Sequence, residues 1–139
     1  MLTPDQLLDH ANQGFQTRIA REEWARSGVS RLYYACYHFC NKAAESWCSG
    51  LPEHLAEKKG HHQKLITRLK NQARQDAIKS HLIDLANMLG KALNERVDAD
   101  YFLDRQVNED SYARTLMCGR QIKAKFEEIE KVVAANGQA

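Results

Sequence analysis

The sequence predicts an all-α protein, built as an up-and-down antiparallel bundle of four to five helices. Only two prolines interrupt the 139 residues, and the rest of the chain is rich in Ala, Leu, Lys, Glu, Arg and Gln, which favour helix. Several segments repeat apolar residues every three or four positions, the period of a helix with one buried face. No internal repeat, low-complexity tract or linker divides the chain, so residues 1–139 are expected to form a single domain.

The first two helices are marked by their ends and by an apolar face. Thr3, Pro4 and Asp5 have the order of an N-cap, a first helical proline and a first-turn acid, so an N-terminal helix is expected within residues 1–20. The apolar stripe of the second helix consists of Val29, Tyr33, Cys36, Cys40 and Trp47. The sequence SGLP, which begins at Ser49, predicts the end of this helix.

The second half of the chain predicts further helices joined by short loops. The loop SGLPEHLAEKKG leads to HHQKLITRLKNQA and then to a helix closed near Gly90. The segment NERVDADYFLD is shorter and less periodic, and the last long helix is expected to begin between Asn108 and Ser111. The residues predicted to face the core are Ile78, Leu82, Leu85 and Leu89, and then Ile122, Phe126, Ile129 and Val133. The tail, residues 134–139, is expected to fray.

Composition is that of an ordinary globular protein and argues against several other classes. Hydrophobic residues make up 43% of the chain and charged residues 27%, close to the averages for globular proteins. No apolar run approaches the roughly 20 residues of a membrane-spanning helix, and the N-terminus MLTPDQLLDH does not resemble a signal peptide. We therefore expect a cytoplasmic protein without membrane contact, in which the cysteines are reduced. They are Cys36, Cys40, Cys48 and Cys118.

Positive charge is concentrated in one segment, although the net charge of the chain is only +2. Residues 58–79 hold seven Lys and Arg against one acid, Asp76, which is a local charge of +6. Such a strip fits contact with RNA phosphates, and a solvated helix face explains it equally well. The candidate RNA-binding residues are Lys58, Lys59, Lys64, Arg68 and Lys70.

The second helix also carries a polar column opposite its apolar stripe. Arg31, His38 and Glu45 are seven positions apart, so each lies within about 20° of the next around the helix axis. Tyr34 lies beside this column and Tyr37 lies between the two faces, which makes the outward side unusually aromatic. We expect these tyrosines to form an interface with a second subunit. A two-fold homodimer through this helix would bring both copies of Arg31 and His38 into one cleft.

Such a cleft suits metal-independent cleavage of RNA. A His can take the proton of a ribose 2′-hydroxyl near neutral pH, and an Arg matches the phosphate with donors that never deprotonate. His38 and Arg31 are therefore the candidate catalytic residues, although spacing alone is also compatible with surface residues that have no chemical role. A second pair with the same spacing, Arg74 and His81, flanks an apolar stripe and is interpreted as covering the core.

No metal and no cofactor is expected. No pair of Cys or His has the spacing of a zinc finger together with a matching second pair, and the adjacent His61 and His62 point in different directions on a helix. The chain also has no glycine-rich phosphate loop.

Three stretches together resemble the HEPN domain, a family named for nucleotide binding in higher eukaryotes and prokaryotes. The stretch SRLYYACYHFCNKAAE is similar to the family's Ser-Arg-x-Tyr-Tyr-Ala helix, and GHHQKLITRL is similar to the His-containing start of its next helix. RVDADYFLD, followed by SYARTLMCGRQIKAKFEEIEK, completes the match in order and approximate spacing. The resemblance covers roughly residues 20 to 131.

This resemblance implies a HEPN-like bundle, a homodimer, and a role in toxin–antitoxin pairs, phage defence or RNA processing. Many HEPN proteins are metal-independent ribonucleases with an Arg and a His separated by a short spacer, a signature that Arg31 and His38 resemble. By this resemblance Arg31 would bind the scissile phosphate and His38 would act as general acid or base. The alternative is a non-catalytic module that docks a nucleotidyltransferase or antitoxin-like partner through the same aromatic face.

Overall fold

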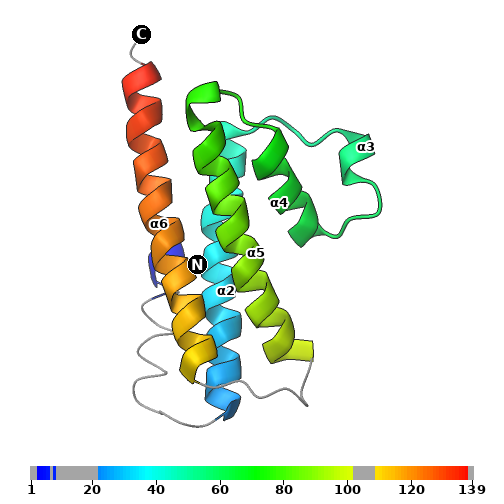
Figure 1. Ribbon diagram of the computed structural model, residues 1–139, viewed down its shortest axis with the longest axis vertical. Helices are drawn as coiled ribbons and strands as arrows, with labels where there is room; N and C mark the ends of the chain where they lie inside the picture. The colour runs from blue at the N-terminus through cyan, green and yellow to red at the C-terminus, as the bar shows by residue number, and fades with distance from the viewer. Residues whose placement is uncertain (1–2, 7, 9–21, 102–108, 138–139) are drawn as a thin grey trace.

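Four main helices pack against one another, so the protein is all-α as predicted (Figure 1). The computed structural model describes residues 3–6, 8, 22–101 and 109–137. The main helices are α2 (Glu22–Trp47), α4 (His61–Asn71), α5 (Lys79–Tyr101) and α6 (Glu109–Gly137), and the short elements are α3 (Glu53–Ala56) and the 3₁₀ helix η1 (Asp76–Ile78). The described residues contain no sheet, and their one β-bridge joins Cys48 to Ala73.

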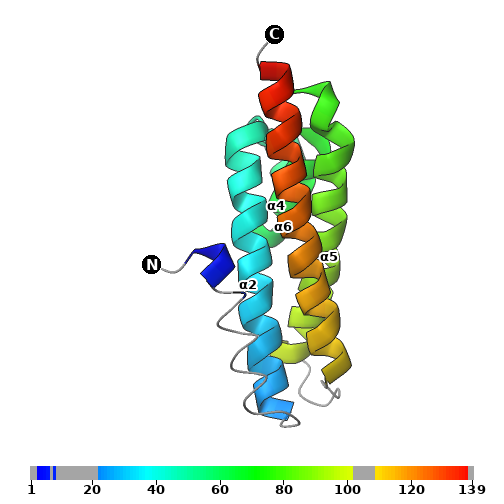
Figure 2. The ribbon, with the colours of Figure 1, turned by 90° about the vertical axis from the view of Figure 1, so that its left-hand side faces the viewer.

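The helices α2, α5 and α6 form a three-helix core, with α4 packed on its flank (Figures 1 and 2). α5 is antiparallel to α2, because Tyr34 contacts Arg96 whereas Cys40, further along α2, contacts Leu85. α4 contacts α2 and α5, and it makes no contact with the described part of α6.

α4 runs parallel to α2, a departure from a purely antiparallel bundle. Tyr33, in the first half of α2, contacts His62 at the start of α4, and Trp47 at the end of α2 bonds to Arg74 just past the end of α4. The cause is the segment of residues 48–60, which includes α3 and carries the chain back along the outer side of α4, so that α4 begins beside the first half of α2 (Figure 1).

The predicted helix start at Thr3 is confirmed by a reciprocal capping box. The backbone N–H of Thr3 donates to Gln6 Oε1 at 2.8 Å, and the backbone N–H of Gln6 donates to Thr3 Oγ1 at 3.1 Å. Leu8 is buried against α6, where a Cβ added to Gly119 would lie 2.7 Å from its side chain. The rest of the predicted N-terminal helix lies outside the described residues.

The core is built from the apolar stripes that the helical period predicts. Tyr33 and Cys36 of α2 are fully buried, and the ring of Trp47 packs against Phe126 of α6 with centroids 4.9 Å apart. The other buried members of the predicted stripes are Val29, Cys40, Ile78, Leu82, Leu85, Leu89, Ile122 and Ile129. All four cysteines are buried and free, as predicted. No helix in the described part of the chain is long and apolar enough to cross a membrane.

Two predicted helix ends differ from the structure. α5 does not close near Gly90 but continues to Tyr101, because Ala92 and Leu93 extend its buried face and outweigh the helix cost of a single glycine, about 1 kcal/mol. α6 continues to Gly137, so residues 134–137, which were expected to fray, are helical. The sequence VVAAN before this end contains alanines, which favour helix.

Two of the helical glycines, Gly28 and Gly90, give opposite expectations for replacement by alanine. A Cβ on Gly28 would lie 2.7 Å from the buried ring of Tyr112, whereas a Cβ on Gly90 would meet nothing within 4 Å. We expect Gly28→Ala to lower the free energy of unfolding by about 1–2 kcal/mol through overpacking. Gly90→Ala should raise it by about 0.5–1 kcal/mol through helix preference. Urea unfolding of both variants tests this, and equal effects would contradict the packing of α2 on α6.

Candidate functional site

A cluster of four polar or aromatic side chains lies where α2, α4 and α5 meet. We call Tyr33, Tyr34, His62 and Arg96 the His62 cluster. His62 Nδ1 lies 2.5 Å from the Tyr33 hydroxyl, and His62 Nε2 lies 3.4 Å from Arg96 Nη1. Arg96 Nη2 donates to the Tyr34 hydroxyl at 3.2 Å. One side chain from α4 and one from α5 are therefore tied to two successive tyrosines of α2.

The guanidinium of Arg96 also lies over the rings of both tyrosines. Its central carbon is 5.6 Å from the ring centroid of Tyr33 and 5.4 Å from that of Tyr34. The two side chains diverge because successive residues of a helix differ by about 100°. Tyr33 is fully buried, while Tyr34 is 40% exposed, so Arg96 lies at the boundary between core and surface. A cation held over two rings is favourable, and more so when it is partly desolvated.

The contacts of His62 define its neutral tautomer. An Arg can only donate hydrogen bonds, so His62 Nε2 is the acceptor toward Arg96 and the proton lies on Nδ1, which donates to the Tyr33 hydroxyl. Burial, and then the neighbouring His61 and Arg96, lower the pKa of His62 below its ordinary value of 6.5. His62 therefore offers a basic nitrogen beside a permanent cation at neutral pH.

A pocket of about 470 Å³ opens beside the cluster, and we call it the Arg96 pocket. Its polar and aromatic lining consists of Tyr34, His61, His62, Gln63 and Arg96, and Leu93 and Val97 of α5 supply apolar lining. Its volume falls within the range of about 300–1,000 Å³ that is usual for small-ligand sites. Its charged group is a guanidinium, so the pocket suits an anionic group such as a phosphate.

The ring centroids of His61 and His62 are 4.0 Å apart and both rings line the same pocket, so the expectation that these adjacent side chains point in different directions is wrong. Among the described residues no group of three or more His, Cys, Asp and Glu side chains is arranged to hold a metal ion. The two histidines thus lie beside an arginine and tyrosines. This set of groups is suited to proton transfer and phosphate binding.

The predicted catalytic residues lie outside this cluster. Arg31 and His38 are both exposed on α2, as the helical column predicts, and Arg31 forms no hydrogen bond or ion pair with any described residue. They are two helical turns apart, about 10 Å along the axis. The ring of His38 contacts that of Tyr37, with centroids 5.9 Å apart. Their catalytic role in a shared cleft stays a prediction.

The predicted interface tyrosines already have partners within the chain. Tyr34 accepts a hydrogen bond from Arg96, and half-buried Tyr37 has ring contacts with His38, His61 and His62 at 5.4–5.9 Å. Tyr37 therefore lies partly under the start of α4. Contact of either tyrosine with a second subunit stays a prediction.

The predicted RNA-binding residues divide into two groups. Lys64 and Lys70 are exposed on α4, and Lys58 is exposed in the turn before it, with a backbone φ of 63°. Lys59, in the same turn, donates to the backbone carbonyl of Leu55 at 2.7 Å. These four lysines lie on α4 or in the turn before it, whereas Arg68 is bonded to the end of α2.

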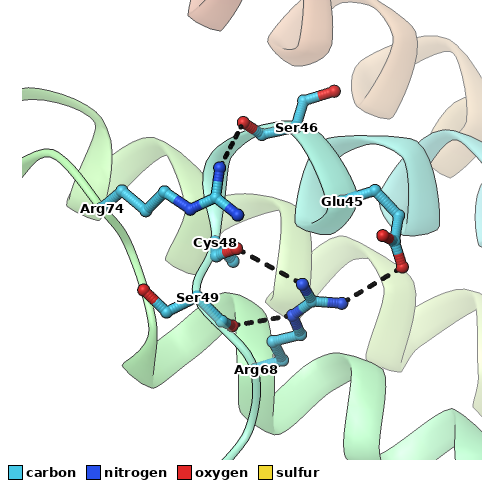
Figure 3. Close-up of polar contacts among 6 residues, drawn as sticks. All are labelled: Glu45, Ser46, Cys48, Ser49, Arg68 and Arg74. Carbon is cyan, nitrogen blue, oxygen red and sulfur yellow. Dashed lines mark hydrogen bonds and ion pairs between the residues drawn. The ribbon is translucent and has the colours of Figure 1, made fainter.

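Arg68 holds the end of α2 (Figure 3). Its Nε donates to the carbonyl of Ser49 at 2.9 Å, its Nη2 to the carbonyl of Cys48 at 3.3 Å, and its Nη1 to Glu45 at 3.3 Å. Arg74 makes a similar bond to the carbonyl of Ser46 at 3.4 Å. These cations satisfy carbonyls at a helix C-terminus, where the backbone lacks partners and carries partial negative charge.

His62 and Arg96 were not among the residues selected from sequence spacing. They are 34 positions apart, on helices whose packing no local pattern specifies. One signal did exist, because Tyr33 belongs to a buried stripe and its hydroxyl must find a partner from another element. Both residues also lie in stretches that resemble HEPN motifs, GHHQKLITRL and RVDADYFLD.

Comparison of the chain with protein-family models, with curated proteins and with solved structures gave no match. The assignment of a function therefore rests on the residues and their geometry.

Alanine replacements should show that Arg68 stabilises the fold and that the exposed Lys70 does not. Arg68→Ala removes bonds to two carbonyls at the end of α2 and should lower the free energy of unfolding by about 1–2 kcal/mol. Lys70→Ala, on the exposed side of the same helix, should change it by less than about 0.5 kcal/mol. Chemical unfolding measures both, and an Arg68→Ala protein as stable as wild type would rule out this role.

The lowered pKa of His62 predicts that acidification destabilises the fold. The unfolded chain binds a proton at His62 more readily than the folded chain, so the free energy of unfolding should fall as the pH falls through 6.5 and then through the lower folded pKa. Unfolding at several pH values between about 5 and 8 should show a shallower dependence in His62→Gln than in wild type. His54→Gln, on the exposed side of α3, is the control, and an unchanged slope in His62→Gln would contradict the assignment.

Proposed function

We propose that the protein is a HEPN-like, dimeric helical domain that binds RNA and cleaves it without a metal ion, as a toxin or defence component. The observation that carries the proposal is the convergence at His62 of the three stretches that resemble HEPN motifs. Tyr33 and Tyr34 come from SRLYYACYHFCNKAAE, His62 from GHHQKLITRL and Arg96 from RVDADYFLD. Residues that share a pocket although they are distant in sequence are better candidates for a common function than residues related by spacing alone.

In this proposal Arg96 binds the scissile phosphate and His62 is the general base. A phosphate in the Arg96 pocket would draw the donors of Arg96 to its oxygens, which leaves His62 Nε2 free to accept a proton. The Nδ1–H bond to Tyr33 orients the imidazole and stabilises its charge once it is protonated. Arg96 then stabilises the negative charge that develops on the phosphate.

The reaction that these groups support is attack by the ribose 2′-oxygen on its own 3′-phosphate. His62 removes the 2′-hydroxyl proton, the new bond forms between the 2′-oxygen and phosphorus, and the bond from phosphorus to the 5′-oxygen breaks. In this proposal the proton for the departing 5′-oxygen comes from His61, whose ring centroid lies 4.0 Å from that of His62. The products are a 2′,3′-cyclic phosphate and a free 5′-hydroxyl, so no water or metal enters the step.

The non-catalytic docking module is the second candidate. It is favoured by the outward face of α2, where Arg31 and His38 are exposed and Tyr34 is 40% exposed. In that case this face binds a nucleotidyltransferase or an antitoxin-like protein, and the His62 cluster is a structural joint between three helices.

Cleavage of labelled RNA in excess EDTA tests the proposal, with the oligomeric state of every variant checked first. His62→Gln and Arg96→Gln should each lower the rate by about 100-fold or more, the usual contribution of a general base or a phosphate-binding group. Arg31→Gln and His38→Gln are the matched pair on the exposed face. If only this second pair abolishes cleavage, the active site is the cleft predicted across the dimer. If wild type neither binds nor cleaves RNA, the docking module replaces the present proposal.

A further inference from the structure

A second pocket lies next to the Arg96 pocket, and we call it the Asn41 pocket. It has a volume of about 410 Å³, and its polar and aromatic lining consists of Tyr37, Asn41, His61, Lys64 and Arg68. Leu51, from the segment that carries α3, and Leu65 of α4 give it apolar walls. This segment lies outside the three-helix core beside α4, so it supplies a wall that the core alone lacks (Figure 1).

The two pockets are neighbours because His61 lines both of them. On α2, the pocket-lining residues Tyr34, Tyr37 and Asn41 are three and four positions apart, so they follow one another along one face of the helix. A ligand that extends along this face therefore meets the guanidinium of Arg96 first and the amide of Asn41 next.

The lining of the Asn41 pocket matches the chemistry of a nucleobase. The rings of Tyr37 and His61, with centroids 5.9 Å apart and planes at 85°, offer an aromatic face on which a flat ring can stack. The half-buried amide of Asn41 makes no hydrogen bond with any described residue, so its donor and acceptor are both available. The Asn amide is complementary to the N6–H and N7 edge of adenine.

The charges around the pocket fit the backbone of the same ligand. Lys64 is exposed and forms no ion pair with a described residue, whereas Arg68, which also lines the pocket, is bonded to the end of α2. Lys64 is therefore the cation available to a phosphate that flanks the base.

We propose that the Asn41 pocket is a base-recognition subsite that holds one nucleobase of single-stranded RNA, preferably adenine, next to the phosphate bound at Arg96. Asn41 reads the edge of the base, and Lys64 contacts the neighbouring phosphate. Of the two perpendicular rings of Tyr37 and His61, one stacks on the face of the base and the other meets it edge-on. This inference rests on the proposed RNA binding and adds sequence selectivity to it.

Fluorescence anisotropy with short 2′-fluoro oligonucleotides tests the subsite, because these RNA analogues lack the attacking hydroxyl and cannot be cleaved. The probes are hexamers of A, of C and of U, and a hexamer of abasic residues. Wild type should bind the A hexamer about tenfold more tightly than the C and U hexamers, the lower end of what a bidentate base contact provides. The abasic hexamer should bind more weakly still, because it also lacks stacking. Asn41→Ala and the near-isosteric Asn41→Leu should bind the A, C and U hexamers equally and keep the affinity for the abasic probe. Asn87→Ala, at an exposed position of α5 that lines neither pocket, should behave as wild type.

The outcomes separate the subsite from the function on which it depends. Suppose that Arg96→Gln weakens binding, but that wild type binds all four probes equally or the Asn41 variants bind as wild type does. This result would overturn the subsite and leave RNA binding in place. A wild-type protein that binds none of the probes would overturn both. Thermal unfolding of the two Asn41 variants shows whether a loss reflects the pocket or the fold, and Asn41→Leu provides the decision if the alanine variant unfolds.

Discussion

The packing of α4 on the three-helix core depends on the hydroxyl of Tyr33. It belongs to a fully buried residue at the centre of the α2 stripe, and leaving such a group without a partner costs about 1–3 kcal/mol. Its partner is His62, in the first turn of α4. This bond sets the register of α4 on α2 at one end, and the bonds from Arg68 and Arg74 to the last carbonyls of α2 set it at the other. Because both pockets lie between α4 and its neighbours, the same register determines their shape.

The contacts that satisfy the polar groups of His62 and Tyr33 also fix the protonation state of both side chains. Desolvation disfavours the charged form of His62, and the cation of Arg96 adds to the effect, so the imidazole is held neutral with a defined tautomer. Burial also raises the pKa of the Tyr33 phenol, which keeps this hydroxyl protonated. The buried hydroxyl of Tyr33 needs a hydrogen-bond partner, and His62 provides it. The same contact orients the neutral imidazole of His62 beside the guanidinium of Arg96.

Structural features that depend only on residues close together in the sequence could be predicted from the sequence. The stripe around Tyr33 follows from the helical period, and the N-cap at Thr3 from the order of three residues, and both are present in the structure. The end expected near Gly90 was wrong, because a glycine signal was outweighed by buried residues beyond it.

The contact between His62 and Arg96 could not be predicted from local pattern. It depends on α4 running parallel to α2, which the segment of residues 48–60 brings about by reversing the chain. Arg68 shows the same limit, since its positive charge is visible in the sequence but its carbonyl partners depend on packing.

The position of α4 outside the three-helix core has a consequence for how the protein opens. α4 buries only Leu65, Ile66 and Leu69 and makes no contact with the described part of α6, whereas α2, α5 and α6 contact one another along their lengths. A unit with few buried residues detaches at a lower free energy than the core, so its amides should exchange with solvent hydrogen through sub-global opening. Each such event would dismantle both pockets while the remaining bundle stays folded. The lifetime of both pockets is then set by the docking of one eleven-residue helix and not by the stability of the whole domain.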